Sequence, residues 1–182
     1  KPTDTKPSLL TFNEVTTFLH EFGHALHGMF SKCTYGSTSM DGVSRDFVEL
    51  PSQFMENYAL EKEWLDTWAV HYQTGEKIPQ EYIDKIKKSS NFQAGYASDR
   101  QLSFGMVDMA WHTITAPVTE SLVDFEQRAM GRTEIMPLVK GTAFSPAFGH
   151  IFAGGYAAGY YGYKWAEVLD ADAFSLFKQR GI

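Results

Sequence analysis

Apolar residues recur at helical spacing along most of the chain, and this pattern predicts a mainly α-helical fold. The clearest case follows Thr11, which has the spacing of a capping box with Glu14. Beyond it the apolar positions come every three or four residues: Val15, Phe18, Leu19, Phe22, Leu26. We therefore expect a helix over about 12–31.

The same periodicity predicts further helices over about 46–60, 62–73, 79–88, 91–115, 118–130 and 157–178. Asp46 is the expected N-cap of the first of these, and Pro51 fits its first turn. Gly-containing or irregular stretches at 35–44, 136–146 and 148–155 are expected to connect them. No segment has a convincing strand pattern, repeat or linker, so residues 1–182 are expected to form a single domain.

The first predicted helix carries two histidines and a glutamate in the spacing of a zinc peptidase motif. His20 and His24 are four positions apart and share one face of a helix, so both imidazoles can reach one ion. Glu21 lies next to His20, where a carboxylate can act on water as a general base without being a ligand. The alternative is a surface helix with two solvated histidines.

A catalytic zinc ion takes three protein ligands and leaves one position open. The expected third ligand is Glu49, 25 positions after the second motif histidine and at the start of the next predicted helix. Glu56, Glu61 and His27 compete with it by spacing alone. Glu49 also has the spacing to serve only as a partner of Asp46 in a helix cap.

Composition narrows the class of protein. Hydrophobic residues make up 43% and charged residues 21% of the 182 residues, as in globular domains. The net charge of −6 gives no reason to expect nucleic acid as a partner, and no apolar run approaches the ~20 residues of a membrane span. Cys33 is the only cysteine, which favours a reducing compartment such as the cytoplasm.

A segment near the end of the chain combines three tyrosines with four glycines. Tyr156, Tyr160 and Tyr163 are spaced to share one helix face, and glycines lie at 154, 155, 159 and 162. Such a glycine density disfavours a plain helix and suits a backbone that moves or approaches a substrate closely. Phenol groups there can donate to a developing oxyanion, or can simply pack in a core.

Three runs in this order resemble the thimet oligopeptidase family of zinc peptidases. They are H-E-F-G-H-A-L-H-G at 20–28, R-D-F-V-E-L-P-S-Q-F-M-E-N at 45–57 and H-I-F-A-G-G-Y-A-A-G-Y-Y-G-Y-K-W at 150–165. Within the family the chain is most similar to the bacterial peptidyl-dipeptidase branch, with the oligopeptidase A branch next. The resemblance implies a zincin-type helical catalytic domain that is the C-terminal piece of a larger two-part peptidase, without its N-terminal portion.

The resemblance also implies roles for individual residues. Glu49 matches the family's third zinc ligand. His150 matches a substrate-binding histidine, and Tyr156 and Tyr163 match the tyrosines nearest the chemistry, with Tyr163 the expected oxyanion donor. Tyr160 is a weaker candidate. Helical spacing, apart from the resemblance, predicts that residues one or two turns after Glu49 support the metal ligands: Ser52, Gln53, Glu56.

The implied activity is zinc-dependent hydrolysis of short peptides in the cytoplasm, with release of C-terminal dipeptides. Internal cleavage of short peptides is the enzymatic alternative. A non-catalytic helical fragment without metal is the alternative of another class.

Overall fold

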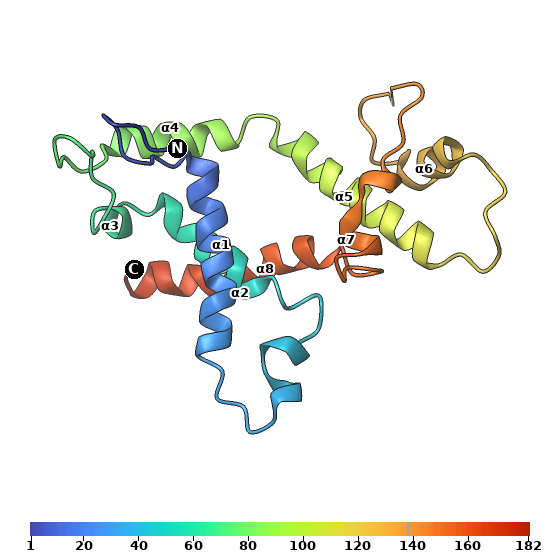
Figure 1. The fold of residues 1–182 in the computed structure, drawn as a ribbon, viewed down its shortest axis with the longest axis horizontal. Helices are drawn as coiled ribbons and strands as arrows, with labels where there is room; N and C mark the ends of the chain where they lie inside the picture. The colour runs from blue at the N-terminus through green and yellow to red at the C-terminus, as the bar shows by residue number, and fades with distance from the viewer. Residues whose placement is uncertain (138) are drawn as a thin grey trace. The chain divides into compact units, whose positions relative to one another are not determined.

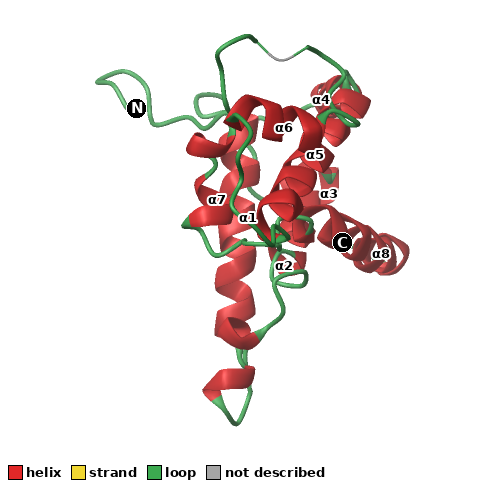
Figure 2. Cartoon of the chain, turned by 90° about the vertical axis from the view of Figure 1, so that its right-hand side faces the viewer, coloured by secondary structure: helices red, strands yellow, loops and turns green. Residues whose placement is uncertain are grey.

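The computed structural model of the chain describes residues 1–137 and 139–182. Regular structure in these residues is helical, as Figures 1 and 2 show, and the only strand-like pairings are isolated bridges. The mainly α-helical fold expected from the sequence is confirmed. The α-helices are α1 Phe12–Met29, α2 Leu50–Glu56, α3 Lys62–Leu65, α4 Gln80–Ser90, α5 Ala94–His112, α6 Leu122–Met130, α7 Gly149–Phe152 and α8 Gly162–Arg180. The 3-10 helices are η1 Gly36–Thr38, η2 Met40–Gly42, η3 Asn57–Leu60 and η4 Ser145–Ala147.

Two compact units make up the chain. The first comprises Lys1–Phe92 with Ala166–Ile182, and the second comprises Gln93–Trp165. The first unit contains α1 to α4 and most of α8, and the second contains α5 to α7. That 1–182 act as a single domain stays a prediction.

Helix α1 begins where the capping box predicts. The Thr11 side chain accepts a hydrogen bond from the Glu14 backbone N–H at 3.3 Å, and the Glu14 carboxylate accepts one from the Thr11 N–H at 2.6 Å. These two bonds satisfy N–H groups that the first turn of a helix leaves without partners.

Helices α1 and α2 approach each other closely at Gly23 (Figure 1). A Cβ atom at this position would lie 2.4 Å from the Pro51 carbonyl oxygen and 2.6 Å from the Ser52 Cα. Leu19 and Ser52 beside the contact are buried. Only glycine therefore lets the backbone of α2 lie directly against α1.

Helix α2 starts four residues later than predicted. Its N-cap is Glu49, and Asp46 lies in the preceding turns, in which the Phe47 and Val48 N–H groups both donate to the Ser44 carbonyl. The expected cap at Asp46 is therefore wrong. Pro51 does occupy the first turn, where its missing N–H costs nothing.

The helix predicted over 62–73 is largely wrong. Helix α3 ends at Leu65, and the chain then reverses at Gly75, whose φ is +73°. The His71 N–H donates to the Glu76 carbonyl at 2.7 Å, and the Ile78 N–H donates to the Ala69 carbonyl at 3.2 Å. Hydrogen bonds across this turn replace the bonds that a longer helix would have made.

The second unit is built around one apolar cluster. Its buried members are Val107, Ala129, Met130, Phe148, Ile151 and Tyr160. Helices α6 and α8 start later than the predicted 118 and 157. Ser121 caps α6 by accepting a hydrogen bond from the Asp124 N–H. Ala158 has a positive φ of 53°, which is not helical, so α8 begins only after it.

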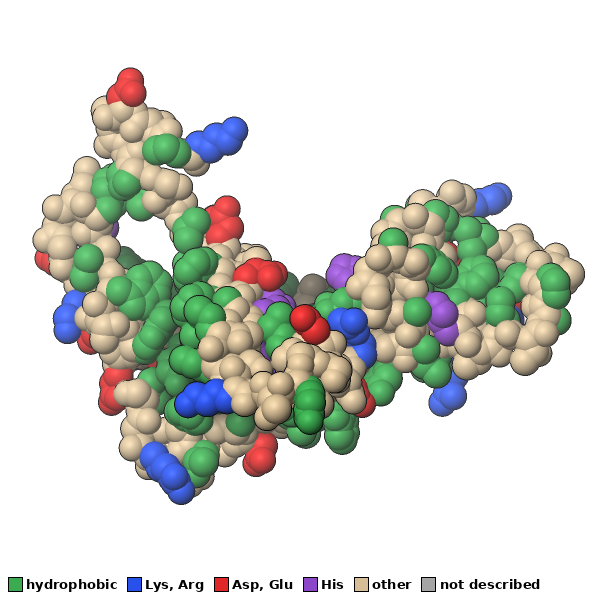
Figure 3. Space-filling model, turned by 60° about the horizontal axis from the view of Figure 1, so that its bottom comes forward, with side chains coloured by type: hydrophobic (Ala, Val, Ile, Leu, Met, Phe, Trp, Pro, Cys, Tyr) green, Lys and Arg blue, Asp and Glu red, His purple; other side chains and the backbone are tan. Residues whose placement is uncertain are grey.

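Large apolar side chains are also exposed in both units, as the green areas of Figure 3 illustrate. On α1 they include a stacked pair, Phe18 and Phe22, which are 61% and 40% exposed. Within the described residues, none of the helices has the length and apolar character needed to cross a lipid bilayer.

One face of α8 buries a carboxylate in an otherwise apolar row. Asp170 lies one turn from both Ala166 and Phe174 and is 8% exposed. Its Oδ1 accepts a hydrogen bond from the Asn57 side chain at 3.3 Å. Burial is the main cause that raises the Asp170 pKa from 3.8 to about 6, because it disfavours the charged form.

We expect Gly23→Ala to destabilise the chain by roughly 1–3 kcal/mol, since the added methyl group must push α2 away from α1. Thermal and denaturant unfolding would measure the change. Gly95→Ala in α5 is the control, because a Cβ there meets nothing within 4 Å. An equal effect of both substitutions would contradict the close contact.

Asp170→Asn is expected to stabilise the chain at pH 7 by roughly 1–3 kcal/mol. The folded state binds the Asp170 proton more tightly than the unfolded state, so stability falls as pH rises from about 4 to 6 and stays reduced above that range. Asparagine removes this loss and keeps the Asn57 contact.

Unfolding of both proteins between pH 4 and 8 would measure the effect. Asp172→Asn, on the exposed face of the same helix, makes the same charge change and should have little effect. The prediction would be contradicted if the free energy of unfolding changed equally between pH 4 and 6 in the wild type and in Asp170→Asn.

Candidate metal centre

Helices α1 and α2 bring two histidines and one carboxylate to a single point. The Glu49 Oε2 lies 3.2 Å from the His20 Nε2 and 3.2 Å from the His24 Nε2. One ligand atom from each residue lies within 4.8 Å of the other two. Two imidazole nitrogens and a carboxylate oxygen are ligands that zinc prefers, and together they could hold one metal ion.

The site concentrates charge around a buried carboxylate. Glu49 is 1% exposed, and the Ser52 hydroxyl donates a hydrogen bond to its Oε2 at 2.9 Å. Hydrogen bonds from His20 to Glu49 and then to Glu56 raise the His20 pKa from 6.5 to about 9. At neutral pH the protonated His20 ring thus places a positive charge beside the Glu49 carboxylate. A bound divalent cation would supply this positive charge instead.

Glu56 holds the other side of the His20 ring. Its Oε1 lies 2.6 Å from the His20 Nδ1, so the ring donates there and presents its Nε2 to Glu49. This arrangement is usual for metal-binding histidines, whose outer nitrogen is oriented by an oxygen acceptor. Of the three expected supporting residues, Ser52 and Glu56 contact the site with their side chains. The Gln53 backbone N–H donates to the Glu49 main-chain carbonyl at 3.0 Å, which is an ordinary bond of the helix.

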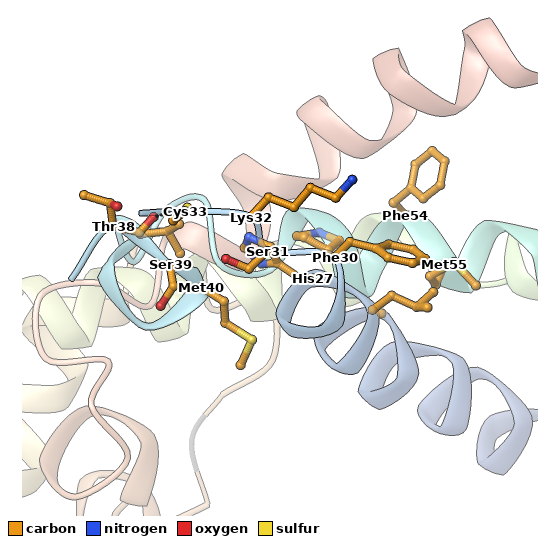
Figure 4. Close-up of a pocket in the computed structure, with 14 residues that line it drawn as sticks. His27, Phe30, Ser31, Lys32, Cys33, Thr38, Ser39, Met40, Phe54 and Met55 are labelled. Atoms are coloured by element: carbon orange, nitrogen blue, oxygen red, sulfur yellow. Dashed lines mark hydrogen bonds between the residues drawn. The ribbon is translucent and has the colours of Figure 1, made fainter. Parts of the chain in front are cut away.

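Of the rival ligands, Glu56 contacts the outer nitrogen of His20, and the other two lie elsewhere. Glu61 pairs with Lys178 at 3.0 Å. His27 lines a cavity of about 500 Å³ between α1, α2 and the loop that joins them, beside Phe30 and Met40 (Figure 4). The His27 Nδ1 is shielded from solvent without a hydrogen-bond partner in the described residues, and its ring meets Phe47 edge-on.

Glu21 is exposed on α1, one position after His20. No hydrogen bond or ion pair engages its carboxylate within the part of the chain that the structure describes. The carboxylate is thus available to a water or a substrate.

The histidine and tyrosines of the glycine-rich segment form a second group, in the other unit. The Tyr156 and Tyr163 rings stack with centroids 5.1 Å apart, and the His150 ring lies 5.9 Å from Tyr156 and 6.4 Å from Tyr163. Tyr160 is 8% exposed, and its hydroxyl donates to Gln101 at 3.0 Å. Burial raises the Tyr160 pKa above its usual 10, which suits a packing role better than catalysis.

Sequence reasoning missed two buried carboxylates of the second unit. Asp108 is fully buried in α5, and Glu126 is 1% exposed in α6. Asp108 accepts hydrogen bonds from the backbone N–H groups of residues 158 and 160. Glu126 accepts them from those of residues 144 and 145. A signal existed, because each acidic residue sits next to apolar core positions such as Val107 and Phe125.

Comparison with known proteins agrees with the motifs. The sequence profile of Peptidase family M3 matches residues 1–182. The chain is 49% identical to the organellar oligopeptidase A, chloroplastic/mitochondrial, of Arabidopsis thaliana, over 100% of the chain and 23% of that protein. It is 45% identical to oligopeptidase A of Escherichia coli (strain K12), over 100% of the chain and 27% of that protein.

A dipeptidyl carboxypeptidase of Salmonella typhimurium is 40% identical over 100% of the chain and 27% of its own length. The chain is thus more similar to these oligopeptidases A than to this dipeptidyl carboxypeptidase, the reverse of the order expected from the motifs. It spans about a quarter of the length of the relatives that it matches. Because the family profile matches every residue from 1 to 182, the chain belongs to Peptidase family M3.

Proposed function

We propose that the chain carries the zinc centre of a peptidase that hydrolyses short peptides, with His20, His24 and Glu49 as the zinc ligands. The observation that carries the proposal is the convergence of two imidazoles on one buried carboxylate, 3.2 Å from each. Three protein ligands with an adjacent free glutamate describe an open, catalytic type of site. A purely structural zinc site would take four protein ligands.

Zinc bound in such a site supplies Lewis acidity and lowers the pKa of a water molecule. Glu21 accepts the proton of the attacking water and delivers it to the leaving amine. Its position beside His20 suits this transfer, as does an exposed carboxylate that forms no hydrogen bond or ion pair with the described residues.

Glu56 and Ser52 position the ligands. Glu56 fixes the orientation of the His20 ring through its Nδ1, and Ser52 fixes one carboxylate oxygen of Glu49. Because both contacts come from α2 itself, the helix that delivers Glu49 also orients the histidine of α1. The site therefore depends on the α1–α2 contact at Gly23.

In the second unit, Tyr163 with Tyr156 supplies hydroxyl donors to the developing oxyanion, and His150 binds substrate. The clustering of these three rings within 6.4 Å supports a shared role. The burial of Tyr160 argues for leaving it out of the reacting group.

Internal cleavage of short peptides is the mode of action we favour. The support is the higher identity to proteins named oligopeptidase A than to dipeptidyl carboxypeptidases. Release of C-terminal dipeptides is the second candidate, supported by the 40% identity to a dipeptidyl carboxypeptidase. Mass spectrometry of the products separates them, since only the second mode yields C-terminal dipeptides alone. A cytoplasmic location is supported by one relative named as a probable cytosolic oligopeptidase A.

Glu49→Ala should abolish tight zinc binding, whereas the wild-type chain should bind about one zinc ion. Glu56→Gln is expected to weaken zinc affinity by roughly 10- to 100-fold, since the His20 ring loses its charged acceptor. Elemental analysis and chelator competition would measure both.

Glu61→Gln is the matched control, because Glu61 pairs with Lys178 and does not reach the site. Undiminished zinc binding by Glu49→Ala would remove Glu49 from the ligand set. Absence of zinc from the supplemented wild-type chain would support the non-catalytic alternative.

Glu21→Gln should keep the zinc and lower peptide turnover by roughly 100- to 10,000-fold, because the amide cannot accept the water proton. Turnover of a quenched fluorescent peptide by the zinc-loaded chain gives the rate. Glu63→Gln, an exposed glutamate of α3, should leave the rate unchanged. Comparable rates for Glu21→Gln and wild type would rule out Glu21 as the general base.

A further inference from the structure

The carboxylate of Asp108 lies fully buried on α5, and both of its oxygens are engaged. Its Oδ1 accepts a hydrogen bond from the Ala158 N–H at 2.9 Å, and its Oδ2 accepts one from the Tyr160 N–H at 2.9 Å. The His112 Nδ1, one helical turn further on, donates to the Asp108 backbone carbonyl at 2.8 Å and also lies 2.8 Å from the Oδ1. Hydrogen bonds to an ionised acceptor are stronger than bonds between neutral groups.

The two backbone donors belong to the turn that carries the tyrosines. Tyr156 precedes this turn and Tyr163 follows it. The Gly159 N–H donates a hydrogen bond to the Tyr156 carbonyl at 2.9 Å and so closes the first half of the turn. Ala158 at its centre has a φ of +53°, in the left-handed region that a residue with a Cβ disfavours. Local preference alone therefore does not hold this conformation.

The turn is tied to α5 at a second point as well. The Tyr160 hydroxyl donates to the Gln101 side chain at 3.0 Å, about two turns before Asp108 on the same helix. Backbone and side chain of the turn are thus both anchored on one rigid element. Tyr156 and Tyr163 flank the anchored residues in the sequence, and their rings stack on each other.

We propose that Asp108 is a positioning residue that clamps the turn over 157–161 and so fixes Tyr156 and Tyr163, which flank the turn in the sequence. The inference rests on the proposed function for the role of the two tyrosines, but the clamp itself is a property of the turn. Without the carboxylate, the Ala158 and Tyr160 N–H groups lose their acceptors, and the strained turn loses the contact that offsets its backbone conformation.

The second unit contains a matched control. Glu126 is equally buried and accepts two backbone hydrogen bonds, from the Phe144 N–H at 2.8 Å and the Ser145 N–H at 2.6 Å. It holds a different segment, before α7. Loss of either carboxylate destabilises the same unit, so a difference between them reports on the turn itself.

Amide hydrogen exchange on the 182-residue chain tests the clamp. In Asp108→Asn the side chain keeps one acceptor oxygen and turns an NH₂ group toward an N–H. Exchange at Ala158 and Tyr160 should accelerate roughly 10- to 100-fold more than exchange at Phe144 and Ser145. Glu126→Gln should give the reverse pattern. Equal acceleration at all four amides in Asp108→Asn would show general destabilisation and overturn the proposal.

His112→Ala keeps the carboxylate and removes the imidazole whose Nδ1 lies 2.8 Å from the Asp108 Oδ1, so this variant serves if Asp108→Asn fails to fold. A smaller acceleration, of roughly 3- to 10-fold, is expected at the same two amides. No selective acceleration at Ala158 and Tyr160 in this variant would also overturn the clamp.

Peptide turnover tests the link to function. In the zinc-loaded chain, Asp108→Asn should lower kcat roughly 10- to 100-fold with zinc content unchanged, and the same substitution should cost much less in a Tyr163→Phe background. Independent effects of the two substitutions on kcat would contradict positioning through the tyrosines. The exchange experiment needs neither zinc nor peptide. An inactive chain would therefore count against the proposed function only, and hydrogen exchange would still decide whether Asp108 clamps the turn.

Discussion

The close contact between α1 and α2 at Gly23 is the constraint on which the metal centre depends. A helix alone aligns His20 with His24, but it cannot deliver a carboxylate between them. The backbone of α2 does so only because it lies within 2.4 Å of where a Cβ at Gly23 would be. At that distance Glu49, the N-cap of α2, reaches both histidines, and Glu56 at the other end of the same short helix orients the first. One missing methyl group thus determines the geometry of four side chains.

Buried carboxylates organise both units by the same physics. A carboxylate taken out of water must recover its hydrogen bonds inside the protein, and it does so from whatever donors its position offers. Glu49 finds imidazoles and a hydroxyl, so a cation can compete for it. Asp108 and Glu126 find backbone N–H groups of distant segments, so each holds a turn in place instead. Asp170 is buried with an amide donor at 3.3 Å, and burial outweighs this bond and raises its pKa.

Where the predicted helices were wrong, the hydrogen bonds of a turn had replaced those of a helix. The predicted helix beyond Leu65 gave way to hydrogen bonds across the Gly75 turn, which join residues only five and nine positions apart. The later start of α8 has a similar origin, because the strained turn at Ala158 is held by Asp108, 50 positions earlier in the chain. Apolar periodicity records which face of a helix is buried, but it does not record where the hydrogen bonds of a turn are satisfied.

The sequence by itself determined the helical class, the capped start of α1, the spacing of the two histidines and the family. Each of these depends on residues a few positions apart, or on three motifs read in order. Spacing alone left Glu61 and His27 as rivals of Glu49, and the tertiary structure placed Glu49 beside the motif, as the family resemblance implied. Only the tertiary structure assigned Glu56 to the outer nitrogen of His20. It also buried Tyr160 and paired Tyr156 with Tyr163. The physical reason is that these choices depend on which segments, tens of residues apart, approach within a few ångströms, and local sequence preferences do not encode that approach.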